Sequence, residues 1–154
     1  MKTNKKILVL LCSIFTLSNP LTVFASSDDN SIISIEYLTD GNYIETKIES
    51  FGNARSTIKN ASKTVTYKNE DGDSLWYAKV TANFYFDGKT SSCTSSSASA
   101  GTYVDGWEIL SKSSSRTGNT GSATVTAGCY MAGFLIKRVP ITVTLSCDKN
   151  GNLS

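Results

Sequence analysis

The stretch LWYAKVTANFYFD, residues 75–87, decides the fold because apolar and polar side chains alternate along most of its length. One face carries Trp76, Ala78, Val80, Ala82, Phe84 and Phe86, and the other carries Tyr77, Lys79, Thr81, Asn83 and Tyr85. A repeat of two residues puts successive side chains on opposite faces of an extended chain, which is typical of a β-strand with one buried face. We therefore predict a half-buried strand over these residues.

The same alternation recurs at Val139–Cys147 and Ser122–Cys129, and more weakly at Lys63–Lys68 and Trp107–Ser111. Helical spacing of apolar residues is not sustained over any comparable length. Five pairs typical of hairpin turns punctuate the chain: Asp40-Gly41, Asp71-Gly72, Asp87-Gly88, Asp105-Gly106 and Asn150-Gly151. The sequence thus predicts an all-β fold, specifically an antiparallel, immunoglobulin-like β-sandwich with an N-terminal β-hairpin.

We expect three parts along the chain: a signal peptide over 1–25, a hairpin and linker over 26–61, and the sandwich domain over 62–154. The hairpin, Ile32–Glu49, is expected to add strands to the main sheet rather than sit apart, because isolated two-stranded hairpins are marginally stable in water. The serine-rich stretch 91–99 contains Cys93 and is predicted to be an ordered edge strand rather than a flexible linker. Pro140 has no N–H, so it should begin its strand or lie where no partner faces it.

The N-terminus has the pattern of a secretion signal, in which Lys2, Lys5 and Lys6 precede the short apolar run 7–15. Small residues predict cleavage between Ala25 and Ser26, and hence a secreted, extracellular product with no stable membrane span. The formal charge of +2 becomes −1 without the signal, because 12 basic residues then face 13 acidic ones. That balance argues against nucleic acid as a partner.

Removal of the signal leaves three cysteines, Cys93, Cys129 and Cys147. Three single bridges can be drawn, and we favour Cys93–Cys147, which would tie an early strand to the end of the last strand. Cys129 shares a face with small apolar residues, so its default is burial as a small hydrophobe. The alternative is an exposed thiol that links a dimer; otherwise we expect a monomer.

The chain contains no histidine, which excludes catalysis by Ser-His-Asp or Cys-His arrangements. The sequence contains neither of the glycine motifs that bind phosphate, G-x-x-x-x-G-K and G-x-G-x-x-G. It also lacks the C-x-x-C spacing of zinc ligands, so we expect no cofactor and no metal. A pair of carboxylates could still catalyse hydrolysis, as in glycosidases. Four aspartates, however, lie in turn sequences, where hydrogen bonding to the turn backbone accounts for them: Asp71, Asp73, Asp87 and Asp105. We therefore expect a protein that is not an enzyme.

Tyr77 and Tyr85 lie on the polar face of the strand predicted over residues 75–87, and they form a candidate binding face for a sugar ring or a protein. The alternative, which we favour, is that a second sheet or the N-terminal hairpin covers this face.

Several motifs together resemble a family of small exported proteins from Gram-positive, Firmicutes-type bacteria. They are EYLTDGNYIET at 36–46, KTVTYKN at 63–69, Leu75-Trp76, Val80-Thr81, Phe86-Asp87-Gly88, Cys93-Thr94-Ser95, Trp107, SRTGNT at 115–120 and TVTLSC at 142–147. The resemblance covers nearly all of the mature chain. It implies export from the cell and a fold, but it implies no activity. It also implies cysteines at the places of Cys93 and Cys147, which supports that pairing, whereas Cys129 departs from the pattern.

Two functions follow as hypotheses. The first is a secreted, non-catalytic binding module for envelope polymer, glycan or protein. The alternative is a secreted antimicrobial or toxin-like effector with a removable N-terminal segment, processed at Arg55 in the linker. Loss of residues 26–55 removes six acidic and two basic residues, which changes the charge from −1 to +3 and would suit an anionic envelope.

Overall fold

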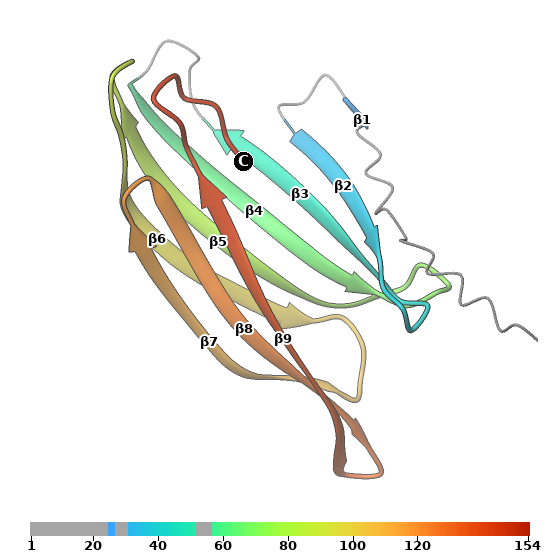
Figure 1. Ribbon diagram of the computed structural model, residues 1–154. Coiled ribbons are helices and arrows are strands. Elements are labelled where there is room, and N and C mark those ends of the chain that lie inside the picture. The colour runs from blue at the N-terminus through green and yellow to red at the C-terminus, as the bar shows by residue number, and fades with distance from the viewer. Residues whose placement is uncertain (1–24, 27–30, 52–56) are drawn as a thin grey trace, which may run out of the picture.

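The computed structural model describes residues 25–26, 31–51 and 57–154, and every regular element in them is a β-strand (Figure 1). The all-β prediction is therefore confirmed. The strands are β1 (Ala25–Ser26), β2 (Ser31–Tyr37), β3 (Tyr43–Phe51), β4 (Ile58–Lys68), β5 (Ser74–Phe86), β6 (Ser91–Thr102), β7 (Trp107–Thr117), β8 (Thr120–Met131) and β9 (Phe134–Ser146).

The strands form two antiparallel sheets, with the order β1-β2-β3-β4-β5-β6 in one and β7-β8-β9 in the other. The sheets pack face to face around one core, which confirms the predicted β-sandwich. Strand order follows chain order within each sheet, so every paired strand is bonded to its neighbour in sequence, and the chain passes from one sheet to the other between β6 and β7. Immunoglobulin domains instead have Greek-key connections, and the immunoglobulin-like part of the prediction is not confirmed.

The core follows the alternation that the sequence shows. The β5 side chains predicted to face inward are at most 1% exposed from position 76 to position 84: Trp76, Ala78, Val80, Ala82 and Phe84. Opposite them lie core residues of the smaller sheet, at most 2% exposed: Ala123, Val125, Ala127, Val143 and Leu145. Because these sets contain several alanines, the side chains between the two sheets are small at the centre. One end of the core is filled by the stacked rings of Trp76 and Trp107, whose centroids are 6.2 Å apart.

The N-terminal hairpin is part of the larger sheet, because β3 pairs with β4 along its whole length. This confirms that the hairpin adds strands to the main sheet. It also corrects the expected division of the chain, because the boundary between residues 61 and 62 falls inside β4. Ala61 itself is fully buried in the core.

The serine-rich stretch forms β6, an edge strand of the larger sheet, as predicted. Its small side chains let β7 of the other sheet come close. Arg116 Nη1 donates to the Cys93 carbonyl at 3.0 Å, and Ser114 Oγ donates to the Ser96 carbonyl at 3.4 Å. These bonds fasten the two sheets to each other along that side.

All five predicted turns contain a glycine with positive φ, between +82° and +91°. Gly151 shows what the turn requires, since a Cβ there would lie 2.6 Å from the Phe86 ring. Pro140 lies inside β9, which is an edge strand of the smaller sheet. Pro140 therefore does not begin its strand, and an edge strand, which has no partner on one side, tolerates a residue without an N–H.

Candidate functional site

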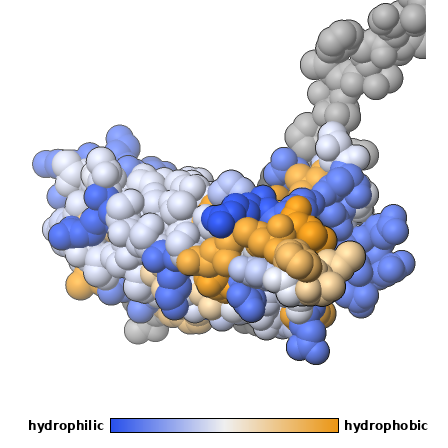
Figure 2. All heavy atoms as spheres, turned by 90° about the horizontal axis from the view of Figure 1, so that it is seen from below, coloured by the Kyte–Doolittle hydropathy of each residue, from blue (hydrophilic) through white to orange (hydrophobic). Residues whose placement is uncertain are grey.

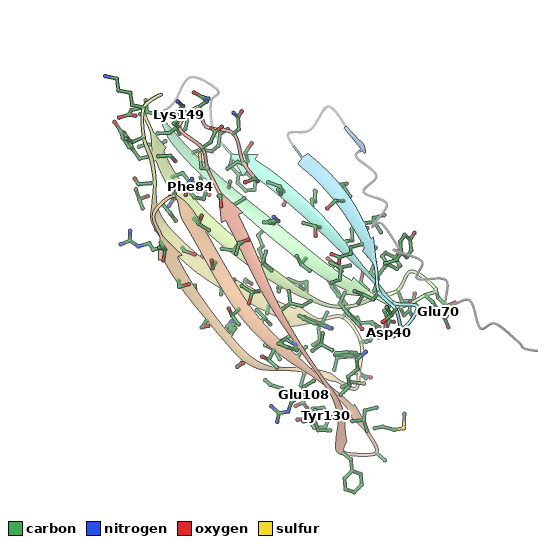
Figure 3. All side chains as sticks on the ribbon, in the orientation of Figure 1. Asp40, Glu70, Phe84, Glu108, Tyr130 and Lys149 are labelled. Carbon is green, nitrogen blue, oxygen red and sulfur yellow. The ribbon has the colours of Figure 1, made fainter. Side chains whose placement is uncertain are left out.

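The best candidate for a site is a cleft where the β2–β3 turn of the larger sheet approaches β9 of the smaller sheet. Its volume is about 460 Å³, within the range of small-molecule sites. Figure 3 shows Asp40 at this end of the molecule, far from Phe84 and Lys149. The cleft is lined by Glu36, Tyr37, Leu38, Thr39, Asp40, Tyr67, Lys137, Arg138, Val139 and Pro140.

Local turn chemistry sets the position of Asp40. Leu38 N donates to the Asn42 carbonyl at 2.8 Å, which closes the hairpin, and Gly41 has φ of +84°. The Asn42 backbone N–H donates to Asp40 Oδ1 at 3.2 Å, an Asx turn that fixes the carboxylate against its own backbone. The second oxygen, Oδ2, is thereby directed toward β9.

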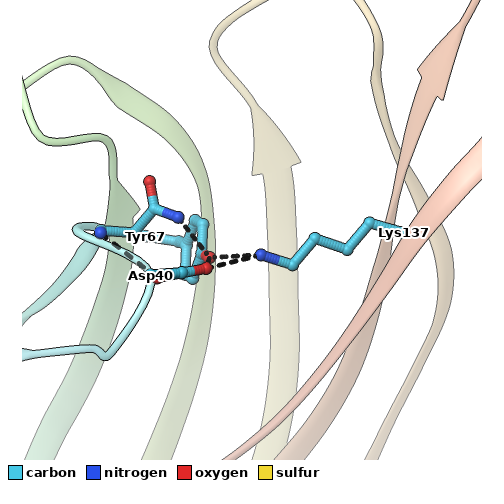
Figure 4. Close-up of polar contacts among 4 residues, drawn as sticks. Asp40, Tyr67 and Lys137 are labelled. Carbon is cyan, nitrogen blue, oxygen red and sulfur yellow. Dashed lines mark hydrogen bonds and ion pairs between the residues drawn. The ribbon is translucent and has the colours of Figure 1, made fainter.

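A polar cluster of Asp40, Asn42, Tyr67 and Lys137 joins the two sheets (Figure 4). Lys137 Nζ donates to Asp40 Oδ2 at 2.8 Å and to the Tyr67 hydroxyl at 3.1 Å. That hydroxyl also accepts from Asn42 Nδ2 at 3.1 Å and donates to Asp40 Oδ2 at 3.3 Å. Asp40 and Lys137 are 97 positions apart in the chain, so this cluster depends wholly on tertiary structure.

Hydrogen bonds from Lys137 and then from Asn42 hold the pKa of the Asp40 carboxyl well below its usual range. The bonds to Asp40 and Tyr67 raise the pKa of Lys137. Both groups are therefore charged at neutral pH, and neither is poised to exchange a proton. Their side chains are 41% and 44% exposed, so the pair positions the walls of the cleft and stabilises the fold only modestly.

The rim of the cleft supplies groups that the cluster does not use. The Tyr37 side chain is 70% exposed, and its ring lies 5.5 Å from the Tyr43 ring at a tilt of 42°. Glu36 and Arg138 are exposed beside it. Neither has an ion-pair partner within the described parts of the chain. The cleft thus combines an aromatic face with charged groups of both signs.

The structure places the tyrosines predicted as a binding face, Tyr77 and Tyr85, on the outer face of the larger sheet. The smaller sheet packs on the opposite face, and the hairpin extends the sheet edge, so the expectation that either would cover this face is wrong. Tyr85 is 42% exposed, whereas Tyr77 is half-buried under Tyr103, with ring centroids 5.7 Å apart. Eight residues of extended strand separate the pair by about 26 Å, too far to share one sugar ring.

All three cysteines in the described residues carry free thiols, so the structure does not contain the predicted Cys93–Cys147 disulfide. Cys93 and Cys147 are buried at the same end of the sandwich, where their backbone N–H groups donate to adjacent carbonyls of the β7–β8 turn, Gly118 at 2.8 Å and Asn119 at 3.1 Å. Burial raises the pKa of both thiols. Cys129 is half-buried in β8 and continues the core face beyond Ala127.

The remaining predicted positions fall at or outside the limits of the described residues. Ala25 and Ser26 form β1, which pairs with β2, while the rest of the expected signal and Arg55 lie outside the described residues. Among described turn carboxylates, Asp87 accepts from the backbone of Lys89 and Thr90, the capping role that the sequence predicts.

Across 25–26, 31–51 and 57–154, no group of three or more metal-ligating side chains gathers in one place. The same residues include no helix of the length and apolarity needed to cross a membrane. Comparison with protein-family models, with curated proteins and with solved structures finds no match to this chain.

Proposed function

We propose that the chain is a secreted, non-catalytic binding module and that the cleft between the β2–β3 turn and β9 holds a saccharide. The observation that carries this proposal is the exposed Tyr37 ring beside a charged cleft of about 460 Å³. A sugar ring presents apolar C–H faces and a rim of hydroxyl groups. An aromatic ring can stack on the first, and carboxylate, ammonium and guanidinium groups can hydrogen-bond to the second.

The internal cluster favours binding because it holds the cleft in one shape before any ligand arrives. Lys137 bonds to both Asp40 and Tyr67, and Tyr67 is only 2% exposed, so one wall is anchored in the core. Preorganised groups lose less conformational entropy on binding. Glu36 and Arg138 remain available at the rim to select among hydroxyl and amide patterns.

A non-catalytic role is supported by the chemistry of the same cluster. The chain has no histidine. The shifts in the pKa of Asp40 and Lys137 move both away from neutrality and keep both charged. General acid–base catalysis works best with a pKa near the working pH, so this pair suits electrostatic positioning rather than proton transfer.

Secretion is proposed from the N-terminal sequence pattern, and the predicted Cys93–Cys147 disulfide fits it. Two buried thiols anchored on one turn would each lose a hydrogen to an oxidant of the extracellular medium, and the bond would close a loop of about 55 residues. The resemblance to exported proteins of Gram-positive bacteria points the same way. An envelope glycan is therefore the saccharide that we propose first.

The effector hypothesis has less support from the fold. Loss of the segment before Arg55 would remove β3, which pairs with β4 throughout its length and contributes Ile48, 7% exposed, to the core. An intact sandwich therefore favours the binding module in one piece.

Calorimetric titration with soluble oligosaccharides, including N-acetylglucosamine oligomers, tests the proposal. Tyr37→Ala should weaken binding by about tenfold or more, because it removes the stacking face. Tyr103→Ala is the matched control, since Tyr103 is also exposed and also tilted against a second tyrosine. Equal binding by Tyr37→Ala and the wild type, or loss of binding in Tyr103→Ala alone, would contradict the proposed site.

A further inference from the structure

The β8–β9 hairpin extends past the ends of the other strands of the sandwich (Figure 1). Its tip is a two-residue turn in which Ala132 and Gly133 have φ of +49° and +82°, the signs expected of a type I′ turn. Met131 pairs with Phe134 across this turn. The tip is therefore a narrow, tightly closed projection.

The residues at this tip are unusually apolar and exposed. Met131 is 66% exposed, Phe134 75% and Ile136 55%. Met131 lies on the face that carries Ala127 and Cys129 further back, so the core stripe of β8 continues past the point where the other sheet covers it. Figure 2 shows apolar atoms gathered on this end of the molecule beside strongly hydrophilic residues.

The base of the hairpin is firmly packed. Gly128 leaves room for Leu110 and Leu135, since a Cβ there would lie 2.9 and 2.7 Å from their methyl groups. Tyr130 N donates to the Gly106 carbonyl at 2.7 Å, which braces the hairpin against the β6–β7 turn. The exposed residues thus project from a rigid support.

We propose that this tip inserts into the interfacial region of a phospholipid bilayer. The shape favours a fluid partner, because a narrow convex projection needs no complementary cavity in a bilayer. Three side chains of this size at these exposures present on the order of 400 Å², about half of the ~800 Å² that each partner of a standard protein interface buries. A second copy or a folded protein is therefore a poorer fit.

The position of Arg138 complements the headgroup layer. It is exposed and lies four residues behind Phe134, about 13 Å along the strand. Apolar groups of interfacial proteins enter the bilayer by about 5–10 Å, which leaves this guanidinium near the phosphates. Arg138 has no ion-pair partner in the described parts of the chain and can bond to a phosphate oxygen.

The net charge at this end is small. Lys137 is paired with Asp40, and Glu108 lies at the hairpin base, where it pairs with Gly128 across β7 and β8. Binding should therefore be driven by apolar insertion and should depend little on anionic lipid. The apolar tip itself, Met131, Phe134 and Ile136, shares no residue with the cleft, whereas Arg138 borders both. Tyr37→Ala should therefore leave vesicle binding unchanged.

Sedimentation with phosphatidylcholine vesicles, with and without phosphatidylglycerol, tests the proposal on the full mature chain. The double variant Met131→Ser/Phe134→Ser should bind at least about tenfold more weakly than the wild type. Phe51→Ser is the matched control, because Phe51 is 52% exposed at the other end of the sandwich, and it should bind normally. Phe134→Trp should keep binding, with a blue-shifted emission that brominated lipid quenches.

Equal vesicle binding by the double variant and the wild type would overturn the proposal, as would absence of wild-type binding. A wild type that is dimeric in sedimentation velocity, with a monomeric double variant, would assign the tip to self-association instead. Circular dichroism keeps the result interpretable, because residues this exposed should leave the fold of each variant intact.

Discussion

Removal of one hydroxyl, in Tyr67→Phe, isolates the polar cluster that joins the sheets. The ring of Tyr67 is buried to 2% exposure, and its hydroxyl contacts Asn42 and Lys137 at 3.1 Å and Asp40 at 3.3 Å. A hydrogen bond to a charged group contributes about 1.5–3 kcal/mol, but Asp40 and Lys137 are exposed enough to recover water. The expected loss in free energy of unfolding is therefore about 1–2 kcal/mol.

Thermal unfolding followed by circular dichroism at pH 7 measures this loss as a decrease in Tm of about 4–8 °C. Tyr37→Phe is the control, because Tyr37 is 70% exposed, and its stability should stay within about 0.5 kcal/mol of wild type. A Tyr67→Phe variant as stable as the wild type would refute the reasoning. So would a loss well above about 3 kcal/mol, which would mean that the hydroxyl organises far more than its own bonds.

Three further predictions concern the turns, acid stability and the thiols. Gly151→Ala should lower Tm more than Gly88→Ala, because both have positive φ but only Gly151 lacks space for a Cβ; equal losses would contradict this. Tm should stay constant from about pH 5 to 8 and fall below about pH 4. A carboxyl whose pKa is lowered by folding binds a proton more readily in the unfolded chain, so acid favours unfolding. Asp148 is such a group, and Asp148→Asn should therefore reduce the fall in Tm. In the reduced protein, iodoacetamide should label Cys129 before the buried Cys93, and the reverse order would count against the described burial.

The strands and turns could be predicted because their signals are local. The alternation in residues 75–87 specifies which side chains of β5 enter the core, and an Asx-Gly pair specifies a turn without reference to the rest of the chain. That the N-terminal hairpin joins the main sheet also follows from a local argument, since two strands alone are marginal, whereas its pairing with β4 is seen only in the structure.

The candidate sites could not be predicted in the same way. Asp40 was visible only as a turn residue, and nothing in the sequence links it to Lys137, 97 positions away. β9 begins at Phe134, five residues before the alternation that predicted it, because the hairpin tip extends beyond the covering sheet and has no buried face to impose a period of two. The outer face with Tyr77 was misjudged because local patterns do not specify which face a second sheet covers.

The most direct test of the binding module is to map its ligand on the ¹⁵N-labelled mature chain. Heteronuclear NMR spectra recorded during titration with an N-acetylglucosamine oligomer, or with the best ligand of the calorimetric panel, locate the amides that respond. The account predicts that the largest shift changes fall in residues 36–42 and 137–141, on the two walls of the cleft. Changes confined to the outer face around Tyr77 and Tyr85, or none at saturating concentration of every saccharide tested, would contradict it.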